Sequence, residues 1–233
     1  IIELHTYNRY LDILYFSTDL YDMIIKKLKF INRNLEFYNL PSGVDLFSPH
    51  KNNSENYFAF IGEIEPNHHN IKVLLQTFNS FPQYELKICT PQKSWNKNRQ
   101  YYEPYLSPNI EILHLINEEA QEFLSKAKYA FFYFPDSNYR KYAMPYKLFE
   151  YVGHNLPIIC NETDYAGLLV KKLGIGYPIP HSVEALTKWL NNIPSEEEYK
   201  QMYNHIETIK KENSWQKRAE TVRDTLMKYR KRA

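Results

Sequence analysis

The sequence predicts an α/β protein built on a doubly wound, parallel, Rossmann-like sheet. Short runs that are apolar throughout, such as YFAFIG (57–62) and YAFFYF (129–134), alternate with amphipathic helical patterns of about ten residues. Strands that are apolar on both faces need helices on both sides of the sheet. Short links with right-handed crossovers then favour the doubly wound arrangement, whose ligands bind beyond the carboxyl ends of the strands.

The composition is that of an ordinary globular protein. The chain has 233 residues, of which 43% are hydrophobic and 24% charged, and its formal net charge is +2. No basic run is interleaved with aromatic residues in the way that a nucleic-acid groove requires, and no apolar run is as long as a membrane-spanning helix. Because the chain begins Ile-Ile-Glu-Leu without Met, we expect it to be a fragment.

Two features bear on location. Cys89 and Cys160 each end a strand-like run, which favours buried free thiols in a reducing, cytoplasmic compartment. Lys26, Lys27 and Lys29 lie near the end of a predicted helix. We favour pairing of these lysines with the helix dipole; the alternative is peripheral contact with an anionic membrane at its inner face.

The first fifty residues contain two predicted strands, at 11–16 and 35–38. Ser17 or Thr18 is expected to cap the helix between them. The turn-rich segment 41–49, PSGVDLFSP, is predicted to be a linker.

Strands and helices alternate through the middle of the chain. Strands are predicted at 57–62, 84–89, 109–115, 129–134, 156–160 and 174–179, and helices at 71–78, 117–127, 145–153 and 164–171. Asn117 is expected to cap the second of these helices. The polar and aromatic segment 91–108 is predicted to be loop with a short helix.

The last third is predicted to be helical. Ser182 is expected to cap a helix at 183–190, and Ser195 with Glu198 forms a capping box for the next one. Ser214 is expected to cap the final helix. The residues predicted to share the inward face of that helix are Trp215, Ala219, Val222, Leu226 and Tyr229.

The stretch 143–160, AMPYKLFEYVGHNLPIIC, carries the strongest functional signal. Pro145 suits the first helical position, and Gly153 suits a helix stop that needs a positive φ. Lys147, Glu150 and His154 form a polar stripe away from the apolar face. A lysine in the first turn adds positive charge to helix N–H groups that already favour anions, and a carboxylate one turn later can accept hydrogen bonds from a diol. The alternative is a solvated Lys–Glu pair.

Other functional patterns have little support. There is no GxGxxG, P-loop, HExxH or CxxC motif, and the chain has six glycines. His68 and His69 are adjacent, which favours the edge of a loop over a metal site. Asp136-Ser137-Asn138 is better explained as a turn than as an acidic metal-binding triplet. We therefore expect no metal and no cofactor.

Several segments, in this order and spacing, resemble the C-terminal, donor-binding half of GT-B glycosyltransferases, of the retaining type common in bacterial polysaccharide assembly. The segments are PSGVDLFSP (41–49), FIGEIEPNHHNIKVLLQTF (60–78), NIEILHLINEEAQEFLSKAKYAFFYFP (109–135), MPYKLFEYVGHNLPIIC (144–160) and SWQKRAETVRDTL (214–226). The resemblance implies a remnant of the acceptor domain at 1–40, a linker at 41–50, a donor-binding domain at 51–213 and a crossover helix at 214–233.

The resemblance also implies roles for particular residues. Glu150 would hold the ribose hydroxyls of a UDP or GDP sugar, and Lys147, with the helix start at Pro145 and Tyr146, would face the diphosphate. Gly62 would let the backbone approach the phosphates and the sugar. The residues that would flank the base are Leu115 and Ile116.

Two positions depart from the resembled pattern. Glu63 follows Gly62 where many relatives carry Arg, and Tyr142 stands where many carry a second Glu. Lys141, Arg140 or Lys147 would then have to supply the missing positive charge.

The expected activity is sugar transfer from a nucleotide sugar to a glycan or lipid-linked acceptor, with retention and without metal. Since most of an acceptor domain is absent, this chain alone is expected to bind donor but not to transfer sugar. The alternatives are a non-catalytic GT-B-like subunit that supports a partner enzyme and, less favoured, a nucleotide-sugar epimerase of the same shape.

Overall fold

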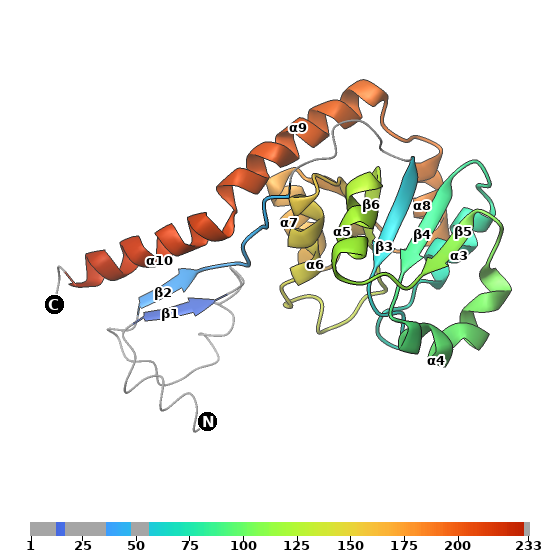
Figure 1. Ribbon diagram of the computed structural model, residues 1–233, viewed down its shortest axis with the longest axis horizontal. Coiled ribbons are helices and arrows are strands. Elements are labelled where there is room, and N and C mark those ends of the chain that lie inside the picture. The colour runs from blue at the N-terminus through green and yellow to red at the C-terminus, as the bar shows by residue number, and fades with distance from the viewer. Residues whose placement is uncertain (1–12, 17–35, 48–55, 231–233) are drawn as a thin grey trace.

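A six-stranded parallel sheet forms the centre of the chain in the computed structural model, which describes residues 13–16, 36–47 and 56–230 (Figure 1). The strand order is β5-β4-β3-β6-β7-β8. The strands are β3 (Tyr57–Ile61), β4 (Glu85–Cys89), β5 (Ile110–Leu113), β6 (Tyr129–Phe132), β7 (Ile158–Asn161) and β8 (Gly176–Ile179). The chain builds outward from β3 in one direction and then returns to β6 and builds in the other. The switch point of the topology therefore lies between β3 and β6.

Helices cover both faces of this sheet, which confirms the doubly wound prediction. The helices of the sheet domain are α3 (Lys72–Asn79), α4 (Gln92–Tyr102) with the 3-10 turn η1 (Glu103–Tyr105), α5 (Asn117–Lys126), α6 (Tyr146–Gly153), α7 (Tyr165–Leu173), α8 (Val183–Leu190) and α9 (Glu196–Glu212). The last helix, α10 (Trp215–Arg230), extends away from the sheet (Figure 1).

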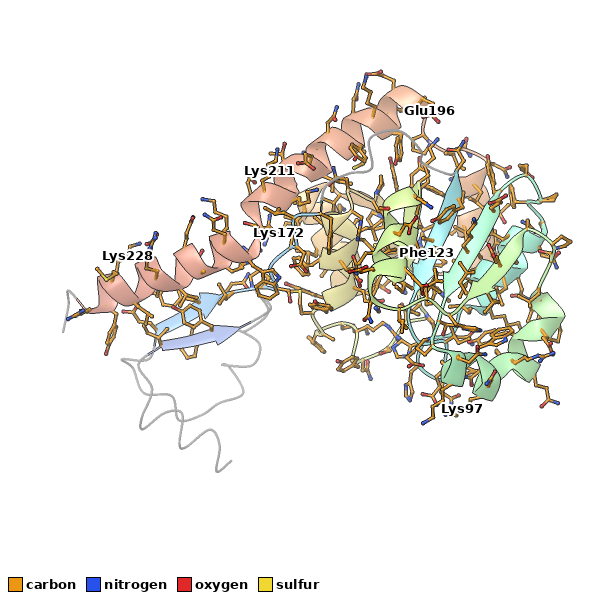
Figure 2. All side chains as sticks on the ribbon, in the orientation of Figure 1. Lys97, Phe123, Lys172, Glu196, Lys211 and Lys228 are labelled. Carbon is orange, nitrogen blue, oxygen red and sulfur yellow. The ribbon has the colours of Figure 1, made fainter. Side chains whose placement is uncertain are left out.

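Successive residues of β3 point to opposite faces, as expected for a strand that is covered on both sides. Tyr57 and Ala59 belong to one core with residues of α5, α6, α7 and α9. Phe58 and Phe60 belong to the other core with residues of α3 and α8. Phe123 of α5, labelled in Figure 2, stacks on Tyr57 with 5.5 Å between the ring centroids.

A smaller part lies beside the sheet domain. Strands β1 (Ile13–Phe16) and β2 (Glu36–Asn39) pair in parallel and lie next to α10 in Figure 1. Both strands confirm the sequence prediction within the described residues. The predicted cap at Ser17 or Thr18 and the lysines at 26, 27 and 29 lie outside the described residues.

Helix α4 is longer than the short helix that the sequence predicts within the segment 91–108. Its residues lack a regular apolar face, and Tyr102 is its fully buried aromatic side chain. Polar contacts one turn apart support it instead: Asn98 Nδ2 donates to the Ser94 carbonyl at 2.8 Å, and Arg99 Nε donates to Glu103 at 2.6 Å.

The prediction that Asn117 caps α5 is wrong. Ile116 holds the N-cap position in an extended conformation and makes no side-chain cap, and Asn117 is the first helical residue. Asn117 has φ +49°, a conformation that asparagine tolerates better than most residues.

Helix α6 also differs from its prediction at both ends. Pro145 occupies the N-cap position with φ −81° and ψ 96°, one residue before the helix begins. Gly153 lies inside the helix without a positive φ, and the left-handed residue is Asn155, with φ +59°. Glycine is needed at 153 for space, because a Cβ there would lie 2.8 Å from the Asp45 carbonyl oxygen and 3.1 Å from the ring of Phe47.

The caps of the last three helices are as predicted. Ser182 Oγ accepts from the Ala185 N–H at 3.1 Å, Ser195 and Glu198 form the reciprocal capping box, and Ser214 Oγ accepts from the Lys217 N–H at 3.3 Å.

The predicted inward face of α10 is only partly right. Val222 is half-buried and Thr225 is buried, but Trp215 and Leu226 are about half exposed. Of the other predicted members, Tyr229 is half-buried and Ala219 is exposed. Lys211 and Lys228, labelled in Figure 2, mark α9 and α10 along the outer side of the molecule.

Cys89 and Cys160 are both buried and both free, as predicted. None of the helices in the described part of the chain combines the length and the apolar character needed to cross a membrane.

Candidate functional site

The site begins where β3 and β6 separate. The two strands pair at Phe58 with Tyr129 and at Ala59 with Ala130. Beyond that point the hydroxyl of Tyr151 on α6 bridges them: it accepts from the Ile61 N–H at 3.3 Å and donates to the Phe131 carbonyl at 3.1 Å. Tyr151 is fully buried, and burial raises its pKa, so its hydroxyl stays protonated and able to donate.

Gly62 follows directly after β3, and its backbone needs a residue without a side chain. Its φ is +152°, which residues with a Cβ rarely adopt. Its N–H donates to the Cys89 carbonyl of β4 at 3.0 Å. A Cβ at this position would lie 3.6 Å from Cε of Lys147, so the lysine stem passes over the glycine.

The N-terminus of α6 is next to this glycine. In the described part of the chain no side chain caps the first N–H groups of the helix, and its first turn contains no acidic residue. Pro145 is buried, whereas the side chain of Tyr146 is 58% exposed. Uncapped N–H groups and the helix dipole make this end attractive to an anion, and the nearby lysine adds a full charge.

Lys147 and Glu150 face one another one turn apart on α6. Lys147 Nζ lies 3.6 Å from Glu150 Oε2, and Gln121 Nε2 of α5 donates to Glu150 Oε1 at 3.1 Å. The side chain of Glu150 is 18% exposed and that of Lys147 is 40% exposed. A simple solvated pair would leave the carboxylate open to water, so the structure favours a held carboxylate beside an accessible cation.

The ends of β4 and β5 form the neighbouring wall. Cys89 Sγ donates to the Leu115 carbonyl at 3.5 Å, and His114 Nδ1 lies 2.8 Å from the Thr90 carbonyl oxygen. Burial raises the pKa of the Cys89 thiol, so it is a neutral packing group. Leu115 is partly buried against the core, and Ile116 is 67% exposed.

Arg140 ties two loops together. Its guanidinium lies 4.7 Å from the centroid of the Phe134 ring and donates to the carbonyl of Pro135 at 3.5 Å and to that of His68. Burial lowers its pKa. These contacts join the loop after β3 to the loop after β6, so the guanidinium is already engaged by the protein.

Lys141 lies in the turn formed by residues 137–142 and is exposed. Lys141 lies close enough to Asp136 to act on it electrostatically. Hydrogen bonds from Thr163 and Asn161 are the main reason that the pKa of Asp136 is lowered, and the charge of Lys141 lowers it to a smaller extent. The segment 136–138 leads into a turn at 138–142, where the Arg140 N–H donates to Ser137 Oγ at 3.2 Å.

The structure thus gathers six of the predicted residues around the carboxyl ends of β3, β4 and β5: Gly62, Leu115, Pro145, Tyr146, Lys147 and Glu150. Of the other two, Ile116 is an exposed neighbour of Leu115, and Lys141 lies in the turn after β6. Sequence reasoning missed one neighbour, Gln121, because a single polar residue on an amphipathic helix carries no distinguishing pattern. The sequence predicts only that Tyr151 faces the core. Helical spacing indicates which way a side chain faces, but it does not indicate which groups the hydroxyl hydrogen-bonds to.

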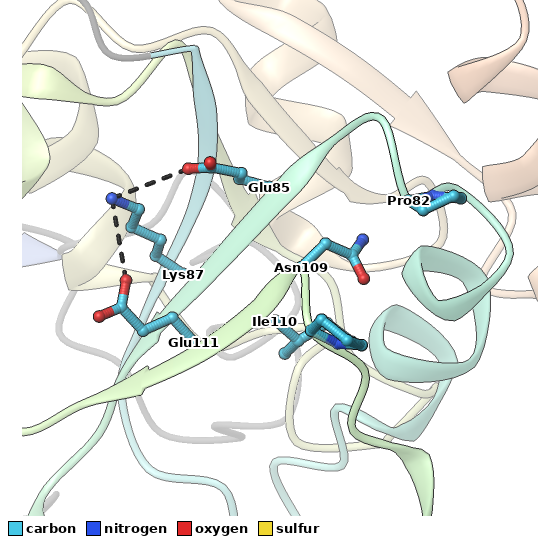
Figure 3. A pocket seen from close by; sticks show the side chains of 7 residues that line it. Pro82, Glu85, Lys87, Asn109, Ile110 and Glu111 are labelled. Atoms are coloured by element: carbon cyan, nitrogen blue, oxygen red, sulfur yellow. Dashed lines mark ion pairs between the residues drawn. The ribbon is translucent and has the colours of Figure 1, made fainter.

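A surface hollow elsewhere does not belong to this site. Its lining includes Glu85, Lys87 and Glu111, near the amino ends of β4 and β5, and Lys87 Nζ lies 3.9 Å from Glu85 and 3.8 Å from Glu111 (Figure 3). These ends are opposite to the strand ends that carry Gly62. Over the residues that the structure describes, no three His, Cys, Asp or Glu side chains gather in a way that could hold a metal ion.

The fold of the chain is similar to that of several solved structures. The chain superposes on a structure of a GtfA/B complex with a TM-score of 0.71 and 14% identity, covering 98% of this chain and 47% of that one. It superposes on the pneumococcal O-GlcNAc transferase GtfA, solved with UDP and GlcNAc, with a TM-score of 0.66 and 13% identity, covering 93% of this chain and 45% of that one. A glycosyltransferase from Rickettsia africae gives a TM-score of 0.70 and 12% identity, covering 98% of this chain and 66% of that one.

The chain therefore spans about half the length of the first two of these proteins. No curated protein matches it in sequence. Residues 70–215 match the family described as glucosyltransferase 3-like, C-terminal domain. The predicted C-terminal half of a GT-B fold is confirmed, and the chain belongs to the glucosyltransferase 3-like family, whose C-terminal domain it contains.

Proposed function

We propose that this chain binds the nucleoside diphosphate of a UDP or GDP sugar and serves as the donor half of a glycosyltransferase. The observation that carries the proposal is the meeting of Gly62, Lys147 and Glu150 at the switch point of the sheet. A glycine with a positive φ, a helix N-terminus without a side-chain cap beside a lysine, and a held carboxylate suit a diphosphate and its ribose.

Each group has a distinct task in this proposal. The first N–H groups of α6 and the Lys147 ammonium receive the diphosphate and stabilise its charge as the nucleoside diphosphate departs. Glu150 accepts hydrogen bonds from the ribose hydroxyls. Leu115 and Ile116 lie beside the base. This is catalysis by positioning and electrostatics, in which the donor half supplies no nucleophile.

The reaction that we propose is transfer of the sugar to a glycan or lipid-linked acceptor, with retention and without a metal ion, at the cytoplasmic side of the membrane. Membership of a glucosyltransferase-like family supports the transfer, and the UDP and GlcNAc of the pneumococcal GtfA structure support a nucleotide sugar as donor. The two buried free thiols support a reducing compartment.

Calorimetric titration of the chain with UDP and with GDP tests the proposal. We expect one of them to bind, and we expect Lys147→Met and Glu150→Gln each to weaken that binding about tenfold or more, the equivalent of about 1.4 kcal/mol. Lys217→Met and Glu220→Gln are matched controls, because these residues form an i, i+3 pair at 2.7 Å on α10, away from the site. Absence of binding at millimolar nucleotide, or equal binding by all four variants, would contradict the proposal.

A second candidate is a non-catalytic subunit that supports a partner enzyme. It is favoured by Glu63, an exposed carboxylate directly after Gly62, where its charge opposes a diphosphate. This candidate predicts a folded chain without nucleotide affinity that co-purifies with one stable partner. The same titration separates the two, since only the first predicts binding that depends on Lys147.

A further inference from the structure

A chain of side-chain contacts leads from Glu150 to the linker. Glu150 Oε1 accepts from Gln121 Nε2 at 3.1 Å, and Gln121 Oε1 lies 2.6 Å from His154 Nε2. The ring of His154 stacks on Phe47, with 4.4 Å between the centroids and 8° between the planes. The contacts join α6, α5 and the segment before β3, and His154 is 7% exposed.

The contacts fix which way round the Gln121 amide lies. A carboxylate only accepts hydrogen bonds, so the side of the amide that faces Glu150 must be the NH₂ group. The amide oxygen then faces His154, whose Nε2 must carry a proton and donate. If the amide were reversed, its oxygen would face the carboxylate and both would be acceptors without a proton between them. With its proton on Nε2, His154 donates to the amide oxygen and supports Gln121 in the one orientation that lets it donate to Glu150.

This arrangement holds one oxygen of Glu150 by a hydrogen bond and leaves the other in the ion pair with Lys147. Oε1 accepts from Gln121, whereas Oε2 lies 3.6 Å from Lys147 Nζ, and the Lys147 side chain is 40% exposed. A carboxylate that must accept from two neighbouring hydroxyls binds them better if its rotation is already restricted, because less side-chain entropy is lost on binding.

We infer that Gln121, aligned by His154, is a positioning residue that orients Glu150 toward the ribose of the bound nucleotide. This inference rests on the proposed function, and it adds two residues that touch neither the phosphates nor the sugar. Phe47 supports the same arrangement from the linker by stacking on His154.

The test compares each nucleotide with its 2′-deoxy form. For whichever of UDP and GDP binds, we divide the Kd of the 2′-deoxy nucleotide by the Kd of the nucleotide itself. This ratio measures how well the protein recognises the 2′-hydroxyl. We expect Gln121→Met to reduce this ratio about threefold or more and to change binding of the 2′-deoxy nucleotide by less than about twofold, since one oriented hydrogen bond is lost. A general loss of structure would weaken both nucleotides alike.

Two further variants sharpen the result. His154→Phe keeps a flat ring against Phe47 but removes the donor to Gln121, and we expect it to reduce the ratio in the same direction. Gln201→Met is the matched control, because Gln201 Nε2 donates to Glu197 Oε1 at 3.3 Å on the exposed side of α9. That variant is expected to keep the wild-type ratio.

The possible results distinguish a failure of the positioning role of Gln121 from a failure of the proposed nucleotide-binding function. If the wild-type chain binds neither nucleotide, the proposed function fails and the positioning role fails with it. If the wild-type chain binds but Gln121→Met and His154→Phe keep the wild-type ratio, only the positioning role is overturned.

Discussion

At the scale of single residues, Tyr151 shows how the site is held open without loss of backbone hydrogen bonds. Strands β3 and β6 separate just before their carboxyl ends, which would leave the Ile61 N–H and the Phe131 carbonyl without strand partners. One buried hydroxyl accepts from the first and donates to the second. The strands can therefore part at the candidate site while both groups stay satisfied.

Removal of that hydroxyl should be costly. Tyr151→Phe keeps the ring but leaves two buried backbone groups unsatisfied, so we expect the free energy of unfolding to fall by about 1–3 kcal/mol in urea denaturation. Tyr101→Phe is the control, since the Tyr101 hydroxyl accepts from Asn70 Nδ2 at an exposed position, and a change below about 0.5 kcal/mol is expected there. Equal stability of the two variants would mean that water replaces the hydroxyl of Tyr151.

The residue scale also shows what sequence reasoning could and could not predict. Lys147 and Glu150 could be paired because the i, i+3 spacing of a helix brings them together whatever the rest of the fold does. Gln121 could not, because its contact with Glu150 joins residues 29 positions apart on separate helices. For Gly153 the sequence predicted a conformational role, yet its role is to admit Asp45 and Phe47 from the distant linker.

At the scale of elements, the strands and the helices with a clear apolar face were predicted well, because burial on both sides of the sheet imposes the pattern. Helix α4 is longer than its sequence predicts because polar pairs one turn apart support it in place of an apolar stripe. The N-cap residues of α6 and α7, Pro145 and Asp164, both make no side-chain cap, but α6 begins beside a lysine whereas α7 begins after a carboxylate that is 1% exposed.

Asp164 should make stability depend on pH. Burial raises its pKa to about 6, partly offset by the charge of Arg140, from an ordinary value of 3.8. Between about pH 4 and 6 the folded chain therefore holds a proton that the unfolded chain has lost, and stability falls as the pH rises through this window. Asp164→Asn removes the titration, so the stability of the variant relative to the wild type should increase by about 2 kcal/mol from pH 4 to pH 7.

Urea denaturation at several pH values measures this difference. Asp136→Asn provides a contrast of opposite sign, because hydrogen bonds from Thr163 and Asn161 lower the pKa of Asp136. The Asp136 carboxylate stabilises the folded chain at pH values above the pKa of the unfolded chain, and this stabilisation is lost as the pH falls. The Asp136→Asn variant should therefore lose stability relative to the wild type as the pH rises. A difference for Asp164→Asn that does not change with pH would show that the carboxylate is hydrated in the folded chain.

At the scale of the whole molecule, the sheet domain and the part formed by β1, β2 and α10 meet at a small joint (Figure 1). The Val44 N–H donates to the Asn213 carbonyl at 2.9 Å, which fastens the linker to the end of α9. Lys210 lies at the centre of the joint and is 2% exposed. Its ammonium donates to the carbonyls of Phe47 at 3.0 Å and Gly153 at 3.3 Å and pairs with Glu207 at 3.0 Å.

Because one buried cation satisfies groups from α6, α9 and the linker, its removal should loosen the joint as a unit. Lys210→Met keeps the length of the side chain but leaves two carbonyls unsatisfied and removes a buried partner of Glu207, so we expect a loss of about 2–4 kcal/mol in the free energy of unfolding. Hydrogen exchange at the Val44 amide should also become faster, since that amide is bonded across the same joint.

Lys211→Met is the matched control for this prediction. Lys211 pairs with the same Glu207 at 3.2 Å, but its side chain is 68% exposed, and a surface ion pair contributes less than about 1 kcal/mol. The control should therefore leave both the unfolding curve and the Val44 exchange rate close to those of the wild type. If Lys210→Met behaves like Lys211→Met, the joint is held by packing around Phe47 and Gly153 rather than by the buried charge.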